Sequence, residues 1–355
     1  MAQSETTIES IVKRVGRDVA KNAPKVSIVT PAYNVAEFAA ETLDSIFAQT
    51  YKDFEIILVN DGSPDTTEFE RILEPYFDRI IYLKQTNAGA GAARNAGIEQ
   101  ARGELLAFLD GDDVWLPEYL ESQTQFLEKN NFDLVYADAA LFGGSTYDGK
   151  TFMQTAPSVG EANFDALLDL RCSIITSGTL ARRRAVIAAG MFECERVLAE
   201  DFMLWLKMAR NGSRIGYQRE ILLKYRVRRE SLSGNSIERV ERGINVFHRV
   251  GEVFPLGETQ KNIIANQLQR FESDLEIERG KSFLLQEKFD SAVGAFTKAN
   301  EYRRSSRLKI IIGLLRFAPR LFLKFYKSRR SGEIMFVPND EKNDSSAFSK
   351  KNLKK

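Results

Sequence analysis

The N-terminal third of the chain alternates three times between a short apolar run, a polar turn and a segment with helical periodicity. The apolar runs cover residues 26–30, 54–59 and 79–84, and the first helical segment covers 35–49. A chain that alternates strands and helices in this order forms parallel strands joined by crossover helices. A fourth run, 105–109, is wholly apolar and is typical of a strand buried on both faces. We therefore predict an α/β domain around a mostly parallel sheet with flanking helices.

The fourth run leads directly into the acidic segment Asp110-Gly-Asp-Asp113. Crowded carboxylates raise one another's pKa unless a cation lies among them, so the cluster favours a divalent ion held by oxygen ligands. Ligands of open α/β sheets also bind at the carboxyl ends of the strands. The alternative is an ordinary acidic turn, since Asp and Gly are common turn residues.

Composition excludes several classes of chemistry. The single histidine, His248, excludes a His-ligated zinc site, and a Ser-His-Asp triad would have to use that residue. Cys172 and Cys194 provide neither metal-ligand spacing nor a disulfide framework, which favours a reducing compartment. The 43% hydrophobic and 28% charged residues are typical of a globular protein large enough for one domain and a smaller appendage.

Charge is unevenly distributed although the net charge is only +1. Residues 303–330 contain ten Lys or Arg and no acid, whereas residues 1–302 contain 35 basic and 45 acidic residues. A nucleic-acid-binding protein would carry its positive charge over the folded body, so we expect no nucleic acid partner.

A helix rich in small residues is predicted within 87–97, where the sequence is Asn-Ala-Gly-Ala-Gly-Ala-Ala-Arg-Asn-Ala-Gly. The segment is not a dinucleotide fingerprint, because Arg94 stands where the third glycine of GxGxxG would be. Small residues let a ligand approach closely, and Arg94 is a candidate contact to a phosphate or a base. The alternative is a solvated surface arginine.

Four segments, in this order and spacing, resemble glycosyltransferase family 2 with its Rossmann-like GT-A fold. They are Val-Ser-Ile-Val-Thr-Pro-Ala-Tyr-Asn at 26–34, Val-Asn-Asp-Gly-Ser at 59–63, the small-residue segment at 87–97, and Leu-Asp-Gly-Asp-Asp at 109–113. The resemblance covers residues 24–235 and implies a nucleotide-sugar donor and a divalent metal, Mg or Mn.

The resemblance also implies roles for individual residues on the donor side. Pro31 and Tyr33 would border the nucleobase and Asp61 would bond to it. Asp110 would lie near the ribose and the metal, with Asp112 as the principal metal ligand and Asp113 beside it. A diphosphate leaving group adds about two negative charges to a carboxylate cluster, an arrangement that requires a metal between them.

Residues 200–210 predict a helix, with Phe202, Trp205, Leu206 and Ala209 along one face and Glu200 and Asp201 at its start. The resemblance implies that Asp201 is the catalytic base, and a helix N-terminus favours the ionised carboxylate that a base needs. The alternative is an ordinary N-cap aspartate. Arg228 occupies a position where many family members have His; its guanidinium can neutralise a diphosphate but cannot ligate a metal.

The secondary structure of the remaining segments of this domain is predicted from the sequence pattern. Residues 133–137 and 174–181 read as strands, and 139–160 as a loop near the acceptor side. In the second of these strands, residues 176–179 resemble the acceptor-side segment of the family. Residues 1–23 are expected to be a polar, helical leader without the apolar core of a signal peptide.

A C-terminal α-helical extension is predicted over residues 236–304. It carries the spacing of one tetratricopeptide-like helix pair at Gly280, Phe283, Phe289, Ala292, Phe296 and Ala299. Such a pair is either a helical brace or a protein-docking element. Residues 331–355 are polar and predicted to be disordered.

Residues 305–330 predict one basic amphipathic helix, kinked at Pro319. Its basic stripe is Lys309, Arg316, Arg320, Lys324 and Lys327, and its apolar face is Leu308, Ile311, Ile312, Leu315, Phe322 and Phe325. The pattern favours the surface of an anionic membrane; the alternative is a helix docked on the protein's own core. No segment is long and apolar enough to predict a membrane span.

We therefore expect an inverting glycosyltransferase that moves a sugar from a UDP-sugar to a hydroxyl of a glycan or lipid-linked acceptor in bacterial surface polysaccharide synthesis. The expected location is the cytoplasm, on the inner face of the plasma membrane. One alternative, a sugar-phosphate nucleotidyltransferase, would need a Gly-rich phosphate loop where this chain has Thr30-Pro-Ala-Tyr33. The other, a non-catalytic scaffold, has no need for the acids at 110, 112 and 201.

Overall fold

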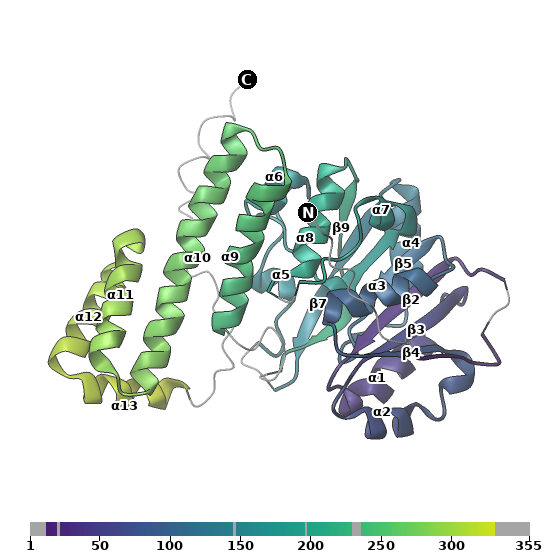
Figure 1. Ribbon diagram of the computed structural model, residues 1–355, viewed down its shortest axis with the longest axis horizontal. Coiled ribbons are helices and arrows are strands. Elements are labelled where there is room, and N and C mark those ends of the chain that lie inside the picture. The colour runs from purple at the N-terminus through teal and green to yellow at the C-terminus, as the bar shows by residue number, and fades with distance from the viewer. Residues whose placement is uncertain (1–11, 20–21, 145–146, 196, 229–235, 331–355) are drawn as a thin grey trace.

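The computed structural model describes residues 12–19, 22–144, 147–195, 197–228 and 236–330. One nine-stranded sheet carries helices on both faces, and five further helices extend from one side of it (Figure 1). The predicted disordered segment 331–355 lies outside the described residues.

The sheet is mixed, with strand order β1-β4-β3-β2-β5-β8-β7-β9-β6. Its strands are β1 (Val12–Val15), β2 (Val26–Ala32), β3 (Phe54–Asp61), β4 (Ile81–Gln85), β5 (Leu105–Phe108), β6 (Val114–Trp115), β7 (Leu134–Phe142), β8 (Thr179–Arg182) and β9 (Ile215–Arg226). The run β4-β3-β2-β5 is parallel, as is the pair β7-β9. Strands β1, β8 and β6 pair antiparallel. The sheet is therefore parallel through the four strands β4-β3-β2-β5 and mixed as a whole.

Alternating residues of the strands belong to two hydrophobic cores, one on each face of the sheet. Ile28 of β2 packs with helices α1 (Ala36–Phe47), α2 (Thr66–Leu73) and α4 (Tyr119–Lys129). Its neighbour Val29 packs on the opposite face with α3 (Ala90–Gln100), α6 (Phe164–Leu168) and α8 (Glu200–Arg210). Successive side chains of a strand point to opposite faces, which explains why the central runs are apolar throughout.

Three local predictions are corrected by the structure. The leader is not helical where it is described, because Val12–Val15 forms the edge strand β1 against β4. The predicted loop 139–160 contains the end of β7 and the short helix α5 (Phe152–Thr155). The strand expected over 174–181 starts only at Thr179, after a 3-10 turn at Thr176–Gly178.

The C-terminal extension begins as part of the same core. Helix α9 (Ser236–Val253) packs Phe247 against Phe202 of α8, with ring centroids 6.2 Å apart. Helix α10 (Glu258–Leu285) follows α9, and Gln260 near its start donates a hydrogen bond of 2.8 Å to Asp165 of α6. The near half of the extension is therefore fixed to the α/β domain (Figure 1).

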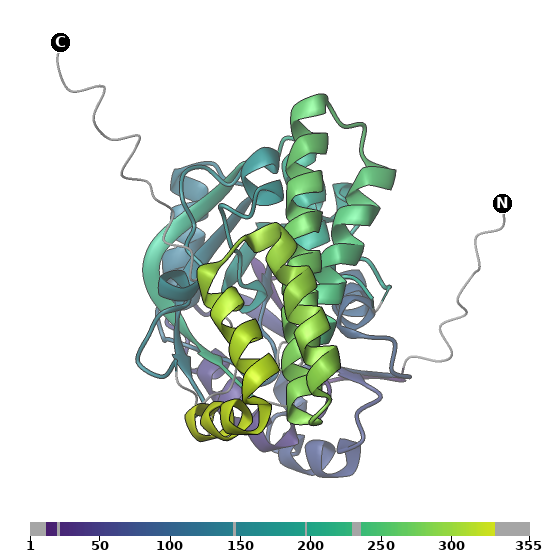
Figure 2. The same cartoon turned by 90° about the vertical axis from the view of Figure 1, so that its left-hand side faces the viewer.

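The far half of the extension has its own small core. Helices α11 (Phe289–Arg303), α12 (Ser306–Phe317) and α13 (Pro319–Arg330) pack in succession beside the end of α10 (Figure 2). The expected antiparallel pair is present: a Cβ on Gly280 of α10 would lie 2.8 Å from the ring of Phe296 of α11, so glycine permits the close approach. Its assignment as a tetratricopeptide repeat stays a prediction.

The predicted single basic helix is two helices, α12 and α13, separated at Ala318. Most of its predicted membrane face is covered by the protein itself, because Leu308, Ile312 and Leu315 are buried against α10 and α11, with Ile311 and Phe322 beside them. The docked alternative is thus correct for this face. Within the described residues, no helix is at once long and apolar enough to cross a membrane.

Candidate active site

The carboxyl ends of β2, β3 and β5 lie side by side and carry the predicted donor-side residues. Pro31 pairs with Val59 and Ala32 with Asn60, so the turns after β2 and β3 are adjacent. The acidic loop 110–113 follows β5, the other neighbour of β2. A Cβ on Gly111 would lie 3.1 Å from the Pro31 carbonyl oxygen and 2.9 Å from Val35, which requires a very small residue there.

Arg94 is buried, with only 5% of its side chain exposed, and joins two acids. It donates to Asp110 at 2.6 Å and to Glu200 at 2.9 Å. The alternative interpretation, a solvated surface arginine, is wrong. Its predicted contact to a phosphate or base is untested, and both of its terminal nitrogens already bind carboxylates. Arg94 therefore links the acidic loop after β5 to the start of α8.

Asp112 faces a second arginine. Its carboxylate forms an ion pair with Arg228, with 2.7 Å between Oδ2 and Nε. The Nη1 group of Arg228 donates a hydrogen bond of 3.3 Å to the Asn34 carbonyl oxygen. Burial raises the pKa of Asp112 and neighbouring Asp110 raises it further, while Arg228 opposes both. Arg228 thus bridges the acidic loop and the turn after β2.

Asp113 lies deeper than its two neighbours and is 1% exposed. Its Oδ1 accepts a hydrogen bond of 2.8 Å from the Arg226 N–H of β9, so it fastens the loop to the sheet. Burial holds the pKa of Asp113 well above its ordinary value, and the charges of Asp112 and Asp110 raise it further. Its predicted role as a metal ligand stays a prediction, and its contacts here are structural.

The residues fit a divalent metal by their chemistry, though their carboxylates do not converge. The described part of the chain contains no preformed group of three or more His, Cys, Asp or Glu side chains. Asp110 and Asp112 are 32% and 14% exposed at their side chains and offer the oxygen ligands that Mg and Mn take. To bind a shared ion, both carboxylates would have to turn away from Arg94 and Arg228. The acids of this site outnumber its arginines, and the excess negative charge favours a bound cation.

Asp61 ends β3 and organises the turn that starts α3. Its carboxylate accepts hydrogen bonds from Gln85 Nε2 at 2.7 Å and from the N–H groups of Ala88 and Gly89, both at 2.8 Å. Its predicted bond to a base is untested. Tyr33, at the end of β2, is 49% exposed and free to meet a planar ligand.

Asp201 is the second residue of α8, whose N-cap is Ala199, so the N-cap interpretation is wrong. Its Oδ2 accepts a hydrogen bond of 2.9 Å from the Thr176 hydroxyl, which fixes the orientation of the carboxylate. It lines a cavity of about 190 Å³. The other walls of that cavity are Phe152, Leu167, Leu170, Cys172, Ser173, Ile174, Phe202 and Trp205.

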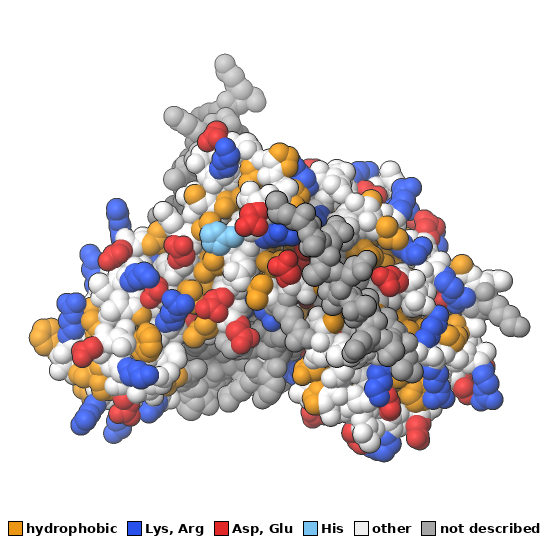
Figure 3. Space-filling model, in the orientation of Figure 1, with side chains coloured by type: hydrophobic (Ala, Val, Ile, Leu, Met, Phe, Trp, Pro, Cys, Tyr) orange, Lys and Arg blue, Asp and Glu red, His pale blue; other side chains and the backbone are white. Residues whose placement is uncertain are grey.

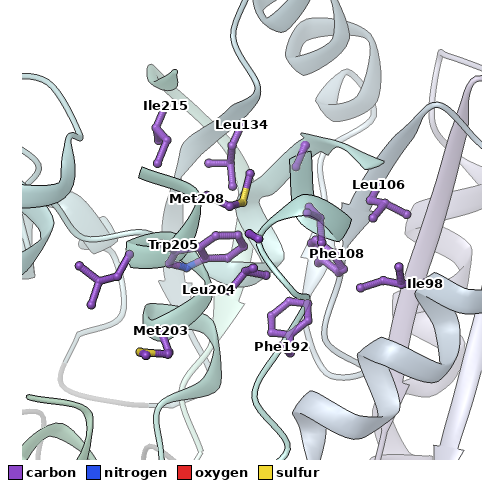
Figure 4. Packing of buried hydrophobic residues seen from close by; sticks show 14 of the residues in the cluster. Ile98, Leu106, Phe108, Leu134, Phe192, Met203, Leu204, Trp205, Met208 and Ile215 are labelled. Carbon is purple, nitrogen blue, oxygen red and sulfur yellow. The ribbon is translucent and has the colours of Figure 1, made fainter. Parts of the chain in front are cut away.

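Helix α8 is held against the sheet by aromatic packing (Figure 4). The rings of Trp205 and Phe192 lie 6.2 Å apart, and Phe192 meets Phe108 of β5 edge to face at 5.2 Å. Because Phe108 lies only two residues before Asp110, this packing sets the position of Asp201 relative to the acidic loop.

Sequence reasoning missed several residues that shape the site. Thr176 orients Asp201, and Ser177 accepts a hydrogen bond of 3.1 Å from the Asp110 N–H. Arg226 donates to the Asp112 carbonyl oxygen at 2.8 Å and pairs with Glu41. The resemblance at 176–179 pointed to the segment of Thr176 and Ser177. Arg226 lies in a segment, 225–233, that also resembles the family, but no local pattern shows its contacts, because its partners lie more than a hundred residues away in sequence.

A larger cavity, of about 960 Å³, lies at the opposite ends of the strands, beside Lys25 and Gly103. Its basic lining is largely neutralised: Lys25 and Arg182 pair with Glu104, and Arg102 pairs with Glu55. It is remote from the acidic loop, which follows the other end of β5, and we do not assign it to the candidate active site.

Comparison with known proteins agrees with this geometry. Residues 27–190 match the family model described as "Glycosyl transferase family 2". An uncharacterized glycosyltransferase of Rickettsia prowazekii is 31% identical over 258 residues, which is 72% of this chain and 80% of the relative. The UDP-Glc:alpha-D-GlcNAc-diphosphoundecaprenol beta-1,3-glucosyltransferase WfgD of Escherichia coli is 31% identical over 227 residues, 62% of this chain and 85% of the relative.

Solved structures share the fold at lower identity. Residues 1–349 of S. aureus TarS with UDP-GlcNAc superpose with a TM-score of 0.56 at 22% identity, covering 87% of this chain and 92% of that one. The mannosyltransferase PcManGT of Pyrobaculum calidifontis, in complex with GDP-Man and Mn²⁺, gives 0.55 at 18% identity, covering 87% of each chain. With the acidic loop, the helix-borne Asp201 and these relatives together, the chain belongs to glycosyltransferase family 2 and has its GT-A fold.

Proposed function

We propose that this glycosyltransferase moves a sugar from a UDP-sugar to a hydroxyl of a lipid-linked glycan, with inversion at the sugar C1. The observation that carries the proposal is the Arg94 bridge. The Arg94 side chain pairs both with Asp110 of the acidic loop, where the donor diphosphate would bind, and with Glu200, the residue before Asp201. A donor bound at Asp110 and a base at Asp201 would then lie on either side of one buried residue, Arg94.

Asp201 is the proposed general base. The carboxylate takes the proton of the acceptor hydroxyl as that oxygen forms its bond to C1. The bond between C1 and the diphosphate oxygen breaks, and its electron pair leaves with the nucleoside diphosphate. Attack from the face opposite the leaving group inverts C1. Thr176 holds the carboxylate in place.

Asp110 and Asp112 are the residues that would hold a divalent metal. When bound, Mg or Mn would neutralise charge on the diphosphate. Arg228 would turn from Asp112 to bind the same diphosphate, because a guanidinium matches phosphate geometry. Tyr33 and Pro31 would border the nucleobase, and Asp61, besides shaping the turn, would accept its N–H.

The apolar cavity beside Asp201 supports an acceptor that carries both hydroxyls and apolar surface. Phe152, Phe202 and Trp205 line it, and sugar rings pack their C–H faces on such side chains. WfgD and its E. coli relative WfaP, by their names, act on a GlcNAc-diphosphoundecaprenol. We infer the same acceptor class here, in bacterial surface polysaccharide synthesis, with the enzyme in the cytoplasm at the inner face of the plasma membrane.

A screen of donors tests the proposal. The protein is incubated with UDP-, GDP- and dTDP-sugars and a short-chain GlcNAc-diphospholipid, with and without EDTA, and products are analysed by mass spectrometry and by NMR of the new anomeric centre. We expect one sugar to be transferred from a UDP-sugar with inversion and EDTA to abolish transfer. Retention, or transfer unchanged by EDTA, would contradict the mechanism. Diphosphate release from a nucleoside triphosphate would favour a nucleotidyltransferase.

Asp201→Asn is the matched variant for the base. The amide keeps the shape and hydrogen bonding of the carboxylate but cannot take a proton, so turnover should fall at least ~10²-fold while donor affinity stays unchanged. Donor affinity is measured by calorimetry and turnover by nucleoside diphosphate release. Normal turnover in a less stable protein would instead give Asp201 a purely structural role.

A further inference from the structure

Helices α12 and α13 carry two apolar stripes, and only one is buried. The buried stripe, which includes Ile312, faces α10 and α11. The other is formed by Ile310, Leu314, Phe317, Leu321 and Phe325, which are 63%, 46%, 91%, 70% and 55% exposed. Residues two positions apart on an α-helix lie about 160° apart around its axis, so Leu314 points almost directly away from the face of Ile312.

The exposed residues form one continuous line on each helix. Ile310, Leu314 and Phe317 recur at steps of four and three, and Leu321 and Phe325 at a step of four. Five of the exposed large hydrophobic side chains of the described residues thus fall within two consecutive short helices. Soluble proteins rarely leave such an apolar patch uncovered, and patches of this kind mark interaction sites.

Basic side chains surround this line. Arg307, Lys309, Arg316, Arg320, Lys324 and Lys327 are all exposed, and residues 305–330 contain no acid. None of the six makes an ion pair with another described residue. Blue and orange side chains gather at this end of the molecule in Figure 3, and the red ones near them belong to neither α12 nor α13. The surface combines uncovered apolar groups with uncompensated positive charge.

We propose that the exposed face of α12 and α13, defined by these five apolar and six basic residues, binds an anionic lipid bilayer in the plane of its headgroups. The apolar line would enter the boundary between headgroups and acyl chains while the cations meet lipid phosphates. Each helix has 12 residues, about 18 Å long, too short to span a bilayer but long enough to lie on one.

Charge distinguishes the bilayer from another copy of the chain as the occupant. A symmetric dimer through this face would bring the same six cations against one another, and that repulsion opposes association. The proposed surface differs from the predicted membrane face, because Leu308, Ile312 and Leu315 lie on the buried side of α12. Of the predicted face, only Phe325 belongs to the proposed surface. The proposal goes beyond the catalytic function and does not depend on it.

Flotation of the full-length protein with vesicles tests the proposal. The vesicles contain phosphatidylcholine either alone or mixed with phosphatidylglycerol. The protein should float with the anionic vesicles at low salt, less at high salt, and poorly with phosphatidylcholine alone, because salt shortens the reach of the charges. Equal recovery with both lipids, or none with either, would overturn the proposal.

Two variants and a control locate the surface. I310S/L314S/F317S keeps the charges and R316Q/R320Q/K324Q keeps the apolar line; each should lower vesicle affinity at least ~10-fold. I187S/V253S removes exposed apolar groups elsewhere, 45% and 42% exposed, and should float like the wild type. All three variants should keep the melting temperature of the wild type and its rate of nucleoside diphosphate release. If the first two float normally, or if light scattering shows a dimer that I310S/L314S/F317S dissociates, the bilayer is not the occupant.

Discussion

At the scale of single residues, the contacts of Arg94 are the feature that the sequence pattern shows least. Its exposure and its partners depend on Glu200, 106 residues away, and no local pattern can show that pairing. The positions of Asp110, Asp112 and Asp201, by contrast, follow from a strand end and a helix start that the sequence pattern predicts. Local motifs therefore located the candidate site, but not the arginines that connect its parts.

Replacing Arg94 should be costly because it would leave two largely buried acids without their cation. Burial already raises the pKa of Glu200, Asp201 raises it further, and Arg94 opposes both. Breaking a buried pair costs about 3–5 kcal/mol, so Arg94→Met should lower the free energy of unfolding by that order in urea titration. The control is Arg71→Met: its pair with Glu68 is exposed and should be worth under about 1 kcal/mol. Similar losses in both variants would refute the structural role of Arg94.

Asp113 predicts a pH dependence of stability in the absence of metal. Its raised pKa means that, above the ordinary carboxyl value of about 4, the folded protein holds a proton that the unfolded chain has released. Stability must then fall as pH rises through that window. Asp113→Asn cannot ionise, so its free energy of unfolding, measured in EDTA from about pH 5 to about pH 8, should fall less steeply than that of the wild type. Parallel curves would show that Asp113 does not titrate there.

At the scale of elements, apolar runs and turn residues predicted the central strands and α8 within a few residues. They failed at β1, whose sequence Val-Lys-Arg-Val is a short edge strand with charged residues, and at β8, which inserts antiparallel between β5 and β7. Both are specified by pairing between segments distant in sequence. The same limit applies to α12, whose apolar residues cover two faces: periodicity shows both, and only the tertiary structure shows which is buried.

Two glycines in the α10–α11 pair predict opposite effects of the same substitution. A Cβ on Gly280 would meet the Phe296 ring, whereas a Cβ on Gly294 of α11 would have no atom within 4 Å. Gly280→Ala should therefore destabilise by about 1–3 kcal/mol through overpacking. Gly294→Ala should stabilise by up to about 1 kcal/mol, because alanine is the better helix former. Thermal unfolding measures both, and a stabilised Gly280→Ala protein would mean that the two helices are not in close contact.

At the scale of the whole molecule, the chain builds a catalytic α/β body and a helical extension whose near half shares the core of that body. Val246, Phe247 and Val250 of α9 pack in the same cluster as α8, the helix that carries Asp201. The family resemblance predicted a boundary near residue 235 and helical periodicity predicted helices beyond it, but neither shows which core a helix joins. The structure ties the extension to the element on which the proposed base is mounted.

Removal of residues 305–355 should destabilise the far half of the extension. Such a chain loses Leu308, Ile312, Leu315 and Leu323, which cover Leu284 and Phe296. A fully buried side chain of this size contributes about 1.5–3 kcal/mol, so the stability of the α10–α11 region should fall by several kcal/mol. We expect a lower melting temperature and binding of an apolar dye, while donor binding persists because the sheet has its own two cores. The I310S/L314S/F317S protein, altered only on the exposed face, should show neither change. An unaltered melting temperature after truncation would mean that α12 and α13 do not stabilise the fold, and their buried stripe would then need another explanation.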